Sequence, residues 1–185
     1  SYYGFIAERH CVMNIQWIVL DVDGVLSDGT LIYTSSGEEL KSFSVKDGLG
    51  LTAARKAGLK LAIITARISP MVERRAKELH FDALLMGHAN KTEALRTLCK
   101  EYQIKLESIA YMGDDLNDLG ALQIVGLPMA PNNAVSEVKQ LAKFISTVNG
   151  GHGAVREAVE YILKNQGLWE TIVADYAREA HAHGQ

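Results

Sequence analysis

Residues 18–25 read IVLDVDGV, a run of branched apolar side chains that stops abruptly at two acids and a glycine. The apolar run begins at Ile15, and its length suits a β-strand buried on both faces of a parallel sheet. Asp21 and Asp23 follow it directly. Because ligands bind at the carboxyl ends of the strands in a doubly wound sheet, the stretch predicts a strand that delivers two carboxylates to a ligand site.

Apolar runs alternate with stretches of helical period along the rest of the chain. The other expected strands are residues 60–64, 83–86, 109–112, 127–130 and 144–146. The expected helices are residues 49–57, 71–79, 92–102, 116–125, 135–142, 154–163 and 169–180. Repeated strand–helix units of this kind predict an α/β fold with a doubly wound parallel sheet.

One segment departs from the alternation. Residues 30–33 and 40–45 are strand-like, and residues 34–38 between them are turn-like, which predicts a β-hairpin inserted after the first strand. A two-stranded hairpin is only marginally stable alone in water. We therefore expect it to pack on another surface, such as a second subunit.

The length of 185 residues suits a single domain, expected over residues 15–180. Residues 1–14 form an N-terminal extension of unknown role, and residues 181–185 are expected to be a flexible C-terminal tail. The formal charge of -3 and the pI near 6.1 provide no basic surface for nucleic acid.

The remaining composition indicates a cytoplasmic protein that does not enter a membrane. No apolar run approaches the length of about 18 residues that a membrane span requires. Cys11 and Cys99 lie far apart without metal-binding spacing, and we interpret them as free thiols in a reducing compartment.

A second group of acids follows the apolar run at residues 109–112. Asp114 and Asp115 come after that run and a glycine, and Asp118 lies three residues further on. Taken alone, Asp118 could be an acid in the first turn of a helix. Carboxylates gathered at one sheet edge repel each other unless a cation neutralises them, and hard oxygen ligands favour magnesium. The sequence therefore predicts a Mg²⁺ site.

Two further side chains complete a site for a phosphoryl group. Thr65 ends the second apolar run, and Lys91 opens the helix expected at 92–102. Singly, Thr65 could be a turn hydroxyl and Lys91 a solvated surface lysine. Beside a magnesium–carboxylate cluster, however, a hydroxyl and an ammonium supply the donors and positive charge that a transferring phosphoryl group needs.

This ordered set of motifs resembles the haloacid dehalogenase superfamily of aspartate-nucleophile phosphatases. The motifs are DVDGV at residues 21–25, Thr65, Lys91 and GDDLND at residues 113–118. The resemblance implies that Asp21 is the nucleophile and that Asp23 is the general acid and then the general base. Thr65 and Lys91 would hold the phosphoryl oxygens.

The same resemblance implies the ligands of the metal. Magnesium would be bound by the Asp21 carboxylate, the Asp23 backbone carbonyl and Asp114. Asp115 and Asp118 would contact these ligands without binding the metal themselves. An aspartate at position 23, instead of a neutral residue, favours a phosphatase over a dehalogenase or an ATPase.

The spacing of the motifs leaves no room for a cap domain over the site. Only 41 residues separate Asp23 from Thr65, and only 25 separate Thr65 from Lys91. Phosphoryl transfer nevertheless works best with water excluded. We therefore expect another subunit to close the site, with the hairpin as the element of assembly.

Four further motifs resemble a capless subgroup of sugar-acid phosphatases, over nearly the whole chain from Ile15. They are VLSDG at 25–29, VKDG at 45–48, TARISP at 65–70 and GGHGAVRE at 150–157. The resemblance implies a homotetramer that hydrolyses 3-deoxy-D-manno-octulosonate 8-phosphate in lipopolysaccharide biosynthesis. Ala66 departs from the subgroup, which usually has glycine there.

Three residues are candidates for binding the rest of the substrate. Arg67 is the first, because the fork of an arginine fits a carboxylate. Arg75, on the helix that follows, could reach a neighbouring site, although a solvated helix face is the better explanation of this residue taken alone. Asp47 of the VKDG motif is the third.

Three other functions compete with this interpretation. A response-regulator receiver is disfavoured, because its acidic pair comes first and its lysine last, whereas GDD follows Lys91 here. A non-catalytic assembly domain, related to those fused to sugar-nucleotide synthetases, is disfavoured by the intact set of reactive residues. A phosphatase for a nine-carbon sialic-type sugar phosphate stays open, because the motifs barely separate the two substrates.

Overall fold

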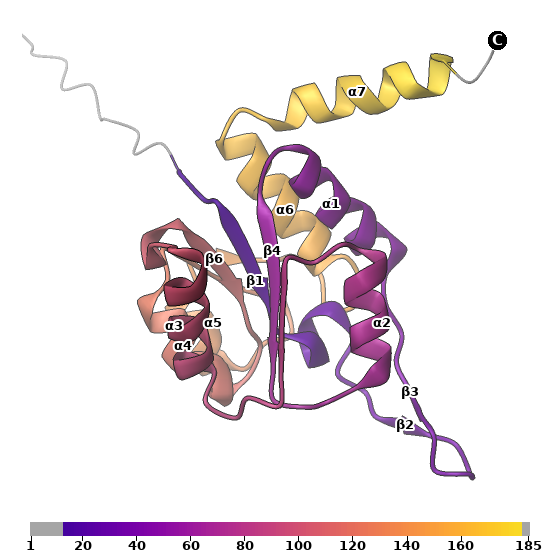
Figure 1. Ribbon diagram of the computed structural model, residues 1–185, viewed down its shortest axis with the longest axis vertical. Helices are drawn as coiled ribbons and strands as arrows, with labels where there is room; N and C mark the ends of the chain where they lie inside the picture. The colour runs from indigo at the N-terminus through magenta and orange to yellow at the C-terminus, as the bar shows by residue number, and fades with distance from the viewer. Residues whose placement is uncertain (1–12, 183–185) are drawn as a thin grey trace, which may run out of the picture.

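The computed structural model describes residues 13–182 (Figure 1). Its centre is a parallel sheet of six strands in the order β5-β4-β1-β6-β7-β8. The strands are β1 Trp17–Leu20, β4 Lys60–Thr65, β5 Ala83–Met86, β6 Ile109–Met112, β7 Leu127–Ala130 and β8 Phe144–Ile145. The chain runs outward from β1 through β4 to β5, then returns to place β6 on the other side of β1. The strand order thus reverses beside β1, which is where doubly wound sheets bind ligands.

Helices cover both faces of the sheet (Figure 1). They are α1 Val45–Lys56, α2 Pro70–Glu78, α3 Lys91–Tyr102, α4 Leu119–Ile124, α5 Ser136–Leu141, α6 Ala154–Asn165 and α7 Trp169–Ala182. Alternate side chains of β1 point into two separate cores, Ile18 and Leu20 into one and Trp17 and Val19 into the other. Burial on both faces explains why the strand is an unbroken apolar run.

Helix capping by side chains fixes where two of the helices near the site begin. Asn90 caps α3, because its side chain accepts a hydrogen bond from the Glu93 N–H at 3.1 Å, and Lys91 is therefore the first helical residue. Ser44 caps α1 in the same way. The prediction that residues 40–45 form a strand and that the helix begins at 49 was wrong, since the Ser44 cap starts the helix at Val45.

The inserted hairpin is confirmed, but it is shorter than predicted. It consists of β2 Ile32–Tyr33 and β3 Glu39–Leu40, paired antiparallel, and it projects beyond the sheet (Figure 1). The apolar side chains of Ile32, Tyr33 and Leu40 are exposed. Within residues 13–182 no separate cap domain stands over the carboxyl ends of the strands.

The predicted terminal segments lie largely outside the described residues. Of the extension at 1–14, only Met13 and Asn14 are described, and of the tail at 181–185, residues 181 and 182 belong to α7. No helix between residues 13 and 182 is long and apolar enough to cross a membrane.

Candidate active site

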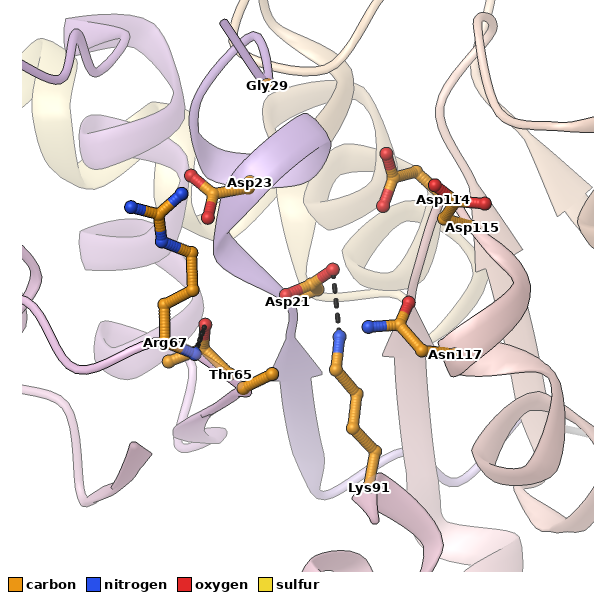
Figure 2. Close-up of a pocket in the computed structure, with 10 residues that line it drawn as sticks. Asp21, Asp23, Gly29, Thr65, Arg67, Lys91, Asp114, Asp115 and Asn117 are labelled. Carbon is orange, nitrogen blue, oxygen red and sulfur yellow. Dashed lines mark hydrogen bonds and ion pairs between the residues drawn. The ribbon is translucent and has the colours of Figure 1, made fainter. Parts of the chain in front are cut away.

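A cavity of about 230 Å³ lies at the carboxyl ends of β1, β4 and β6 (Figure 2). Polar side chains from all three strand ends reach it, together with the first residue of α3. Its lining residues are Asp21, Asp23, Gly29, Thr65, Ala66, Arg67, Lys91, Asp114, Asp115 and Asn117. The structure thus brings together the side chains that the four sequence motifs had predicted to meet.

Asp21 lies at the centre of this cavity, directly after β1 (Figure 2). One carboxylate oxygen, Oδ1, accepts a hydrogen bond from the Val22 N–H at 2.7 Å. The other, Oδ2, lies 3.0 Å from Nζ of Lys91, a residue that is only 2% exposed. Burial and the negative charge of Asp118 raise the pKa of Asp21 to about 8, against the opposing effect of Lys91.

Asp118 is fully buried behind Asp21 and is surrounded by hydrogen-bond donors. Its Oδ1 accepts from Nζ of Lys91 at 2.9 Å and from the Tyr111 hydroxyl at 2.7 Å. Its Oδ2 accepts from the backbone N–H groups of Asp114 at 2.9 Å and Asp115 at 3.3 Å. With both oxygens engaged, Asp118 orients Lys91 and the turn after β6, and its place behind the metal ligands stays a prediction.

Asp114 brings a third carboxylate to the same place. One oxygen each from Asp21, Asp114 and Asp118 lies within 4.8 Å of the others. Burial, and then the charges of Asp118 and Asp115, raise the pKa of Asp114 to about 6. Three clustered carboxylates face a single ammonium, and such an excess of oxygen ligands and negative charge fits a hard divalent cation such as Mg²⁺.

The loop after β1 passes close to the Asp114 side chain at Gly24. A Cβ on Gly24 would lie 1.9 Å from Oδ2 of Asp114, and its φ of +85° is in the left-handed region. The carboxylate of Asp114 therefore lies next to the DVDG turn. The Asp23 carbonyl on that turn stays a predicted metal ligand.

Thr65, the last residue of β4, and Arg67, which follows the strand, form another wall of the cavity. Thr65 is buried, and its hydroxyl oxygen accepts a hydrogen bond from the Arg67 N–H at 3.4 Å. The Arg67 guanidinium donates from Nη2 to both carboxylate oxygens of Glu39, at 3.0 Å each. Arg67 thus lines the cavity, and its binding of a substrate's anionic group stays a prediction.

The structure does not bring two predicted substrate-binding residues to the cavity. Arg75, on α2, donates to Glu78 at 3.3 Å and lies 3.5 Å from the Ser44 carbonyl oxygen. Asp47 is buried in the first turn of α1, where its Oδ1 accepts from the Arg156 N–H of α6 at 2.9 Å. Asp47 therefore joins two helices, and burial keeps it from a ligand in this cavity.

We expect Asp47→Ala to affect stability and to leave substrate binding unchanged. The change deprives the Arg156 N–H of its acceptor, which costs about 1–3 kcal/mol when the group is buried. The Tm should fall by about 2–4 °C for each kcal/mol lost. KM for a phosphate ester should change by less than about two-fold, and Asp47→Asn, which keeps an acceptor oxygen, should be milder. A large increase in KM with an unchanged Tm would restore Asp47 as a substrate ligand.

Three residues at the site were missed by the sequence motifs. Tyr111 lies inside β6, and its hydroxyl reaches Asp118. Lys41 and Glu39 come from the end of the hairpin, and Nζ of Lys41 lies 2.7 Å from Oδ1 of Asp23. Of these three, only Tyr111 could have been recognised from the sequence, because a buried tyrosine in an otherwise aliphatic strand needs a hydrogen-bond partner.

Comparison with known proteins gives the family to which the chain is related. A family described as haloacid dehalogenase-like hydrolase matches residues 84–158. The chain is also 41% identical over 154 residues to 3-deoxy-D-manno-octulosonate 8-phosphate phosphatase of Escherichia coli K12, which is 83% of this chain and 82% of that protein. The chain belongs to the haloacid dehalogenase-like hydrolases. The predicted superfamily is therefore confirmed.

Solved structures of family members have the same fold. The 3-deoxy-D-manno-octulosonate 8-phosphate phosphatase of Moraxella catarrhalis, in complex with magnesium ion, phosphate ion and a KDO molecule, is 44% identical with a TM-score of 0.87, over 89% of this chain and 95% of that one. The cobalt-bound enzyme of Haemophilus influenzae is 38% identical with a TM-score of 0.81, over 84% and 91%. The capless α/β architecture is thus shared over most of the chain.

Proposed function

We propose that this member of the family hydrolyses 3-deoxy-D-manno-octulosonate 8-phosphate to the free sugar acid and phosphate, with Mg²⁺, in the cytoplasmic part of lipopolysaccharide biosynthesis. The observation that carries the proposal is the buried contact of 3.0 Å between Nζ of Lys91 and Oδ2 of Asp21 inside the carboxylate-lined cavity. The identity of 41% to a phosphatase of that name supports the choice of substrate.

In the first step Asp21 attacks the phosphorus of the bound ester. A bond forms between a carboxylate oxygen of Asp21 and phosphorus, and the bond between phosphorus and the sugar oxygen breaks. Asp23 donates a proton to the departing sugar oxygen. Lys91 and the Thr65 hydroxyl lie in the cavity wall beside Asp21, where their donors can stabilise charge on the phosphoryl oxygens.

In the second step the phospho-aspartate on Asp21 is hydrolysed. Asp23 is now a carboxylate and accepts a proton from water as the water oxygen attacks phosphorus. The bond between phosphorus and the Asp21 oxygen breaks, which releases phosphate and restores the carboxylate. The same side chain is therefore acid in one step and base in the next.

The residues that would hold Mg²⁺ are the carboxylates of Asp21 and Asp114 and the backbone carbonyl of Asp23. When bound, the ion neutralises the clustered carboxylates and the phosphoryl oxygens, which lowers the repulsion between nucleophile and substrate. Asp118 holds the Asp114–Asp115 turn through two backbone hydrogen bonds and thereby keeps the Asp114 carboxylate in place.

The proposed enzyme is a homotetramer whose neighbouring subunits close the cavity. The supporting observation is the projecting hairpin, which leaves Ile32, Tyr33 and Leu40 exposed although apolar side chains favour burial. Arg67 at the cavity wall would bind the carboxylate of the sugar acid. Arg75, which is remote from the cavity of its own chain, could contribute only to that of a neighbour.

The deciding measurement is phosphate release from a panel of sugar phosphates, with Mg²⁺ and with EDTA. We expect strong preference for the eight-carbon 8-phosphate and a decrease of activity to background in EDTA, since Asp21 and Asp114 then repel the substrate. Preference for a nine-carbon 9-phosphate would contradict the proposed substrate and keep the chemistry. If no ester released phosphate in a magnesium-dependent reaction, the result would contradict the proposed enzymatic activity and favour the interpretation as an assembly domain.

A further inference from the structure

A buried lysine holds the predicted acid–base residue from the hairpin side. Lys41 directly follows β3, and its side chain is only 2% exposed. Its Nζ lies 2.7 Å from Oδ1 of Asp23 and 3.2 Å from Oε1 of Glu39. A desolvated ammonium is costly unless it is paired, so these two carboxylates fix where the lysine lies.

The hydrogen bonds to Asp23 divide its two oxygens into different roles. Oδ1 accepts from Nζ of Lys41 at 2.7 Å and from the Ser27 hydroxyl at 3.4 Å. Among residues 13–182, no side chain donates to Oδ2 of Asp23. One oxygen is therefore anchored while the other is available, which is the arrangement that proton transfer by a fixed carboxyl group requires.

The lysine is itself held in place by a chain of charges that ends at the cavity wall. Glu39 accepts from Lys41 through Oε1, and both its oxygens accept from the Arg67 guanidinium at 3.0 Å. Arg67 and Asp23 both line the cavity. The base of the hairpin thus ties two walls of the site together through Arg67, Glu39, Lys41 and Asp23.

We propose that Lys41 is a positioning residue for the reaction, which anchors Oδ1 of Asp23 so that Oδ2 faces the reacting oxygen. This inference rests on the proposed function. The proton passes from Oδ2 of Asp23 to the sugar oxygen as the phosphorus–oxygen bond breaks, and a proton from water returns to the same oxygen in the second step. Lys41 donates a hydrogen bond throughout and transfers no proton.

The first test is Lys41→Met, which keeps the length of the side chain and removes its charge and donors. We expect the rate of sugar release in a single turnover to fall by about 10²-fold, the lower range for loss of general acid catalysis. KM and the half-saturating Mg²⁺ concentration should change by less than about three-fold. Lys41→Arg should restore at least a tenth of the wild-type rate, because it can still donate to Asp23.

Two controls separate positioning from general damage to the protein. Lys77→Met removes a lysine whose side chain is 79% exposed on α2, and it should leave the rate unchanged. The Tm of every variant is measured, so that a loss of fold is seen directly. A 10²-fold loss in Lys41→Met that Lys41→Arg fails to reverse would count against the inference.

The decisive experiment is a double-mutant cycle between Lys41 and Asp23, read as the single-turnover rate. If Lys41 acts through Asp23, Lys41→Met in an Asp23→Asn background should slow the reaction by less than about two-fold. Two fully additive losses would overturn the inference. Wild-type turnover of the sugar-acid phosphate is scored separately: if only other alkyl phosphates are hydrolysed, the proposed substrate fails, and the cycle on such an ester still decides the role of Lys41, because an alkoxide leaving group also needs a proton.

Discussion

Asp21→Asn is expected to lose about 10⁴-fold or more of the phosphatase activity while the protein without metal becomes more stable. Activity is lost because an amide is a poor nucleophile towards phosphorus, and among residues 13–182 Asp21 is the carboxylate that follows β1, between β4 and β6. The neighbour Asp114 cannot replace it, since the Gly24 turn and its own hydrogen-bonded backbone hold it on the β6 side.

The gain in stability follows from the charge balance of the site. Asp21 and Asp118 pair with the ammonium of Lys91, and Asp114 joins the same cluster of carboxylates, so among the described residues the cluster without metal carries excess negative charge. Burial and Asp118 raise the pKa of Asp21 to about 8 from a reference value of 3.8. At pH values between 3.8 and about 8, the folded protein therefore binds more protons than the unfolded chain. The contribution of Asp21 to stability declines as pH rises through that range.

Because this contribution declines as pH rises, the difference in stability between Asp21→Asn and wild type should depend on pH. In EDTA at pH 8 the Tm of Asp21→Asn should exceed that of wild type by about 4 °C, if removing the charge recovers about 1–2 kcal/mol. At pH 5, where wild-type Asp21 is protonated in the folded state, the difference should be smaller. Asn also keeps an acceptor for the Val22 N–H.

The measurements are phosphate release and thermal unfolding in EDTA at both pH values. Asp175→Asn on α7, far in the sequence from the site motifs, is the matched control and should change neither activity nor the pH trend. A lower Tm for Asp21→Asn at pH 8 would show that the Lys91 contact outweighs the repulsion. Retained activity would exclude Asp21 as the nucleophile.

The sheet and the reactive centre could be predicted from the sequence because short local sequence patterns determine both. The strands β5, β6 and β7 have the predicted bounds, since a strand buried on both faces is an unbroken apolar run. Asp21, Thr65 and Asp114 each follow such a run. Parallel strands end at one sheet edge, so these positions had to converge there.

The supporting contacts could not be predicted, because they depend on how distant segments pack. Lys41 and Glu39 are 18 and 16 positions from Asp23 along the chain, and nothing local marks either one as buried. Asp47 was assigned to substrate binding from its motif, yet its partner is the backbone of Arg156, 109 positions away. The start of α1 depended on a single hydrogen bond from the Asp47 N–H to Ser44, in a segment that also reads as a strand.

Lys91→Met is expected to combine a large loss of activity with a large loss of stability, unlike Asp21→Asn. Nζ of Lys91 lies 3.0 Å from Asp21 and 2.9 Å from Asp118, and the residue is almost fully buried. Burial alone would lower the pKa of Lys91, but the two carboxylates outweigh burial and raise it. Removing the ammonium leaves Asp118, which has no access to solvent, as an uncompensated buried charge.

The expected loss of stability is about 3–5 kcal/mol, the cost of breaking a buried ion pair by removing one partner. Activity should fall by about 10³-fold, as for the loss of a donor that stabilises charge in the transition state. Urea unfolding at pH 8 in EDTA measures the first effect and phosphate release the second. Adding Mg²⁺ should recover part of the stability, because the ion screens the Asp21 and Asp114 carboxylates.

A second substitution separates the two roles of this lysine. In Lys91→Met with Asp118→Asn, the buried charge on position 118 is absent, and the amide oxygen still accepts from a backbone N–H or from Tyr111. Stability should return to within about 1–2 kcal/mol of wild type, because no buried carboxylate is left without a partner. Activity should stay low, since the donor to the phosphoryl group is still missing. If the double variant regained activity, Lys91 would act only by neutralising Asp118; if it stayed unstable, the aliphatic stem of the lysine, and not its charge, would be what the fold requires.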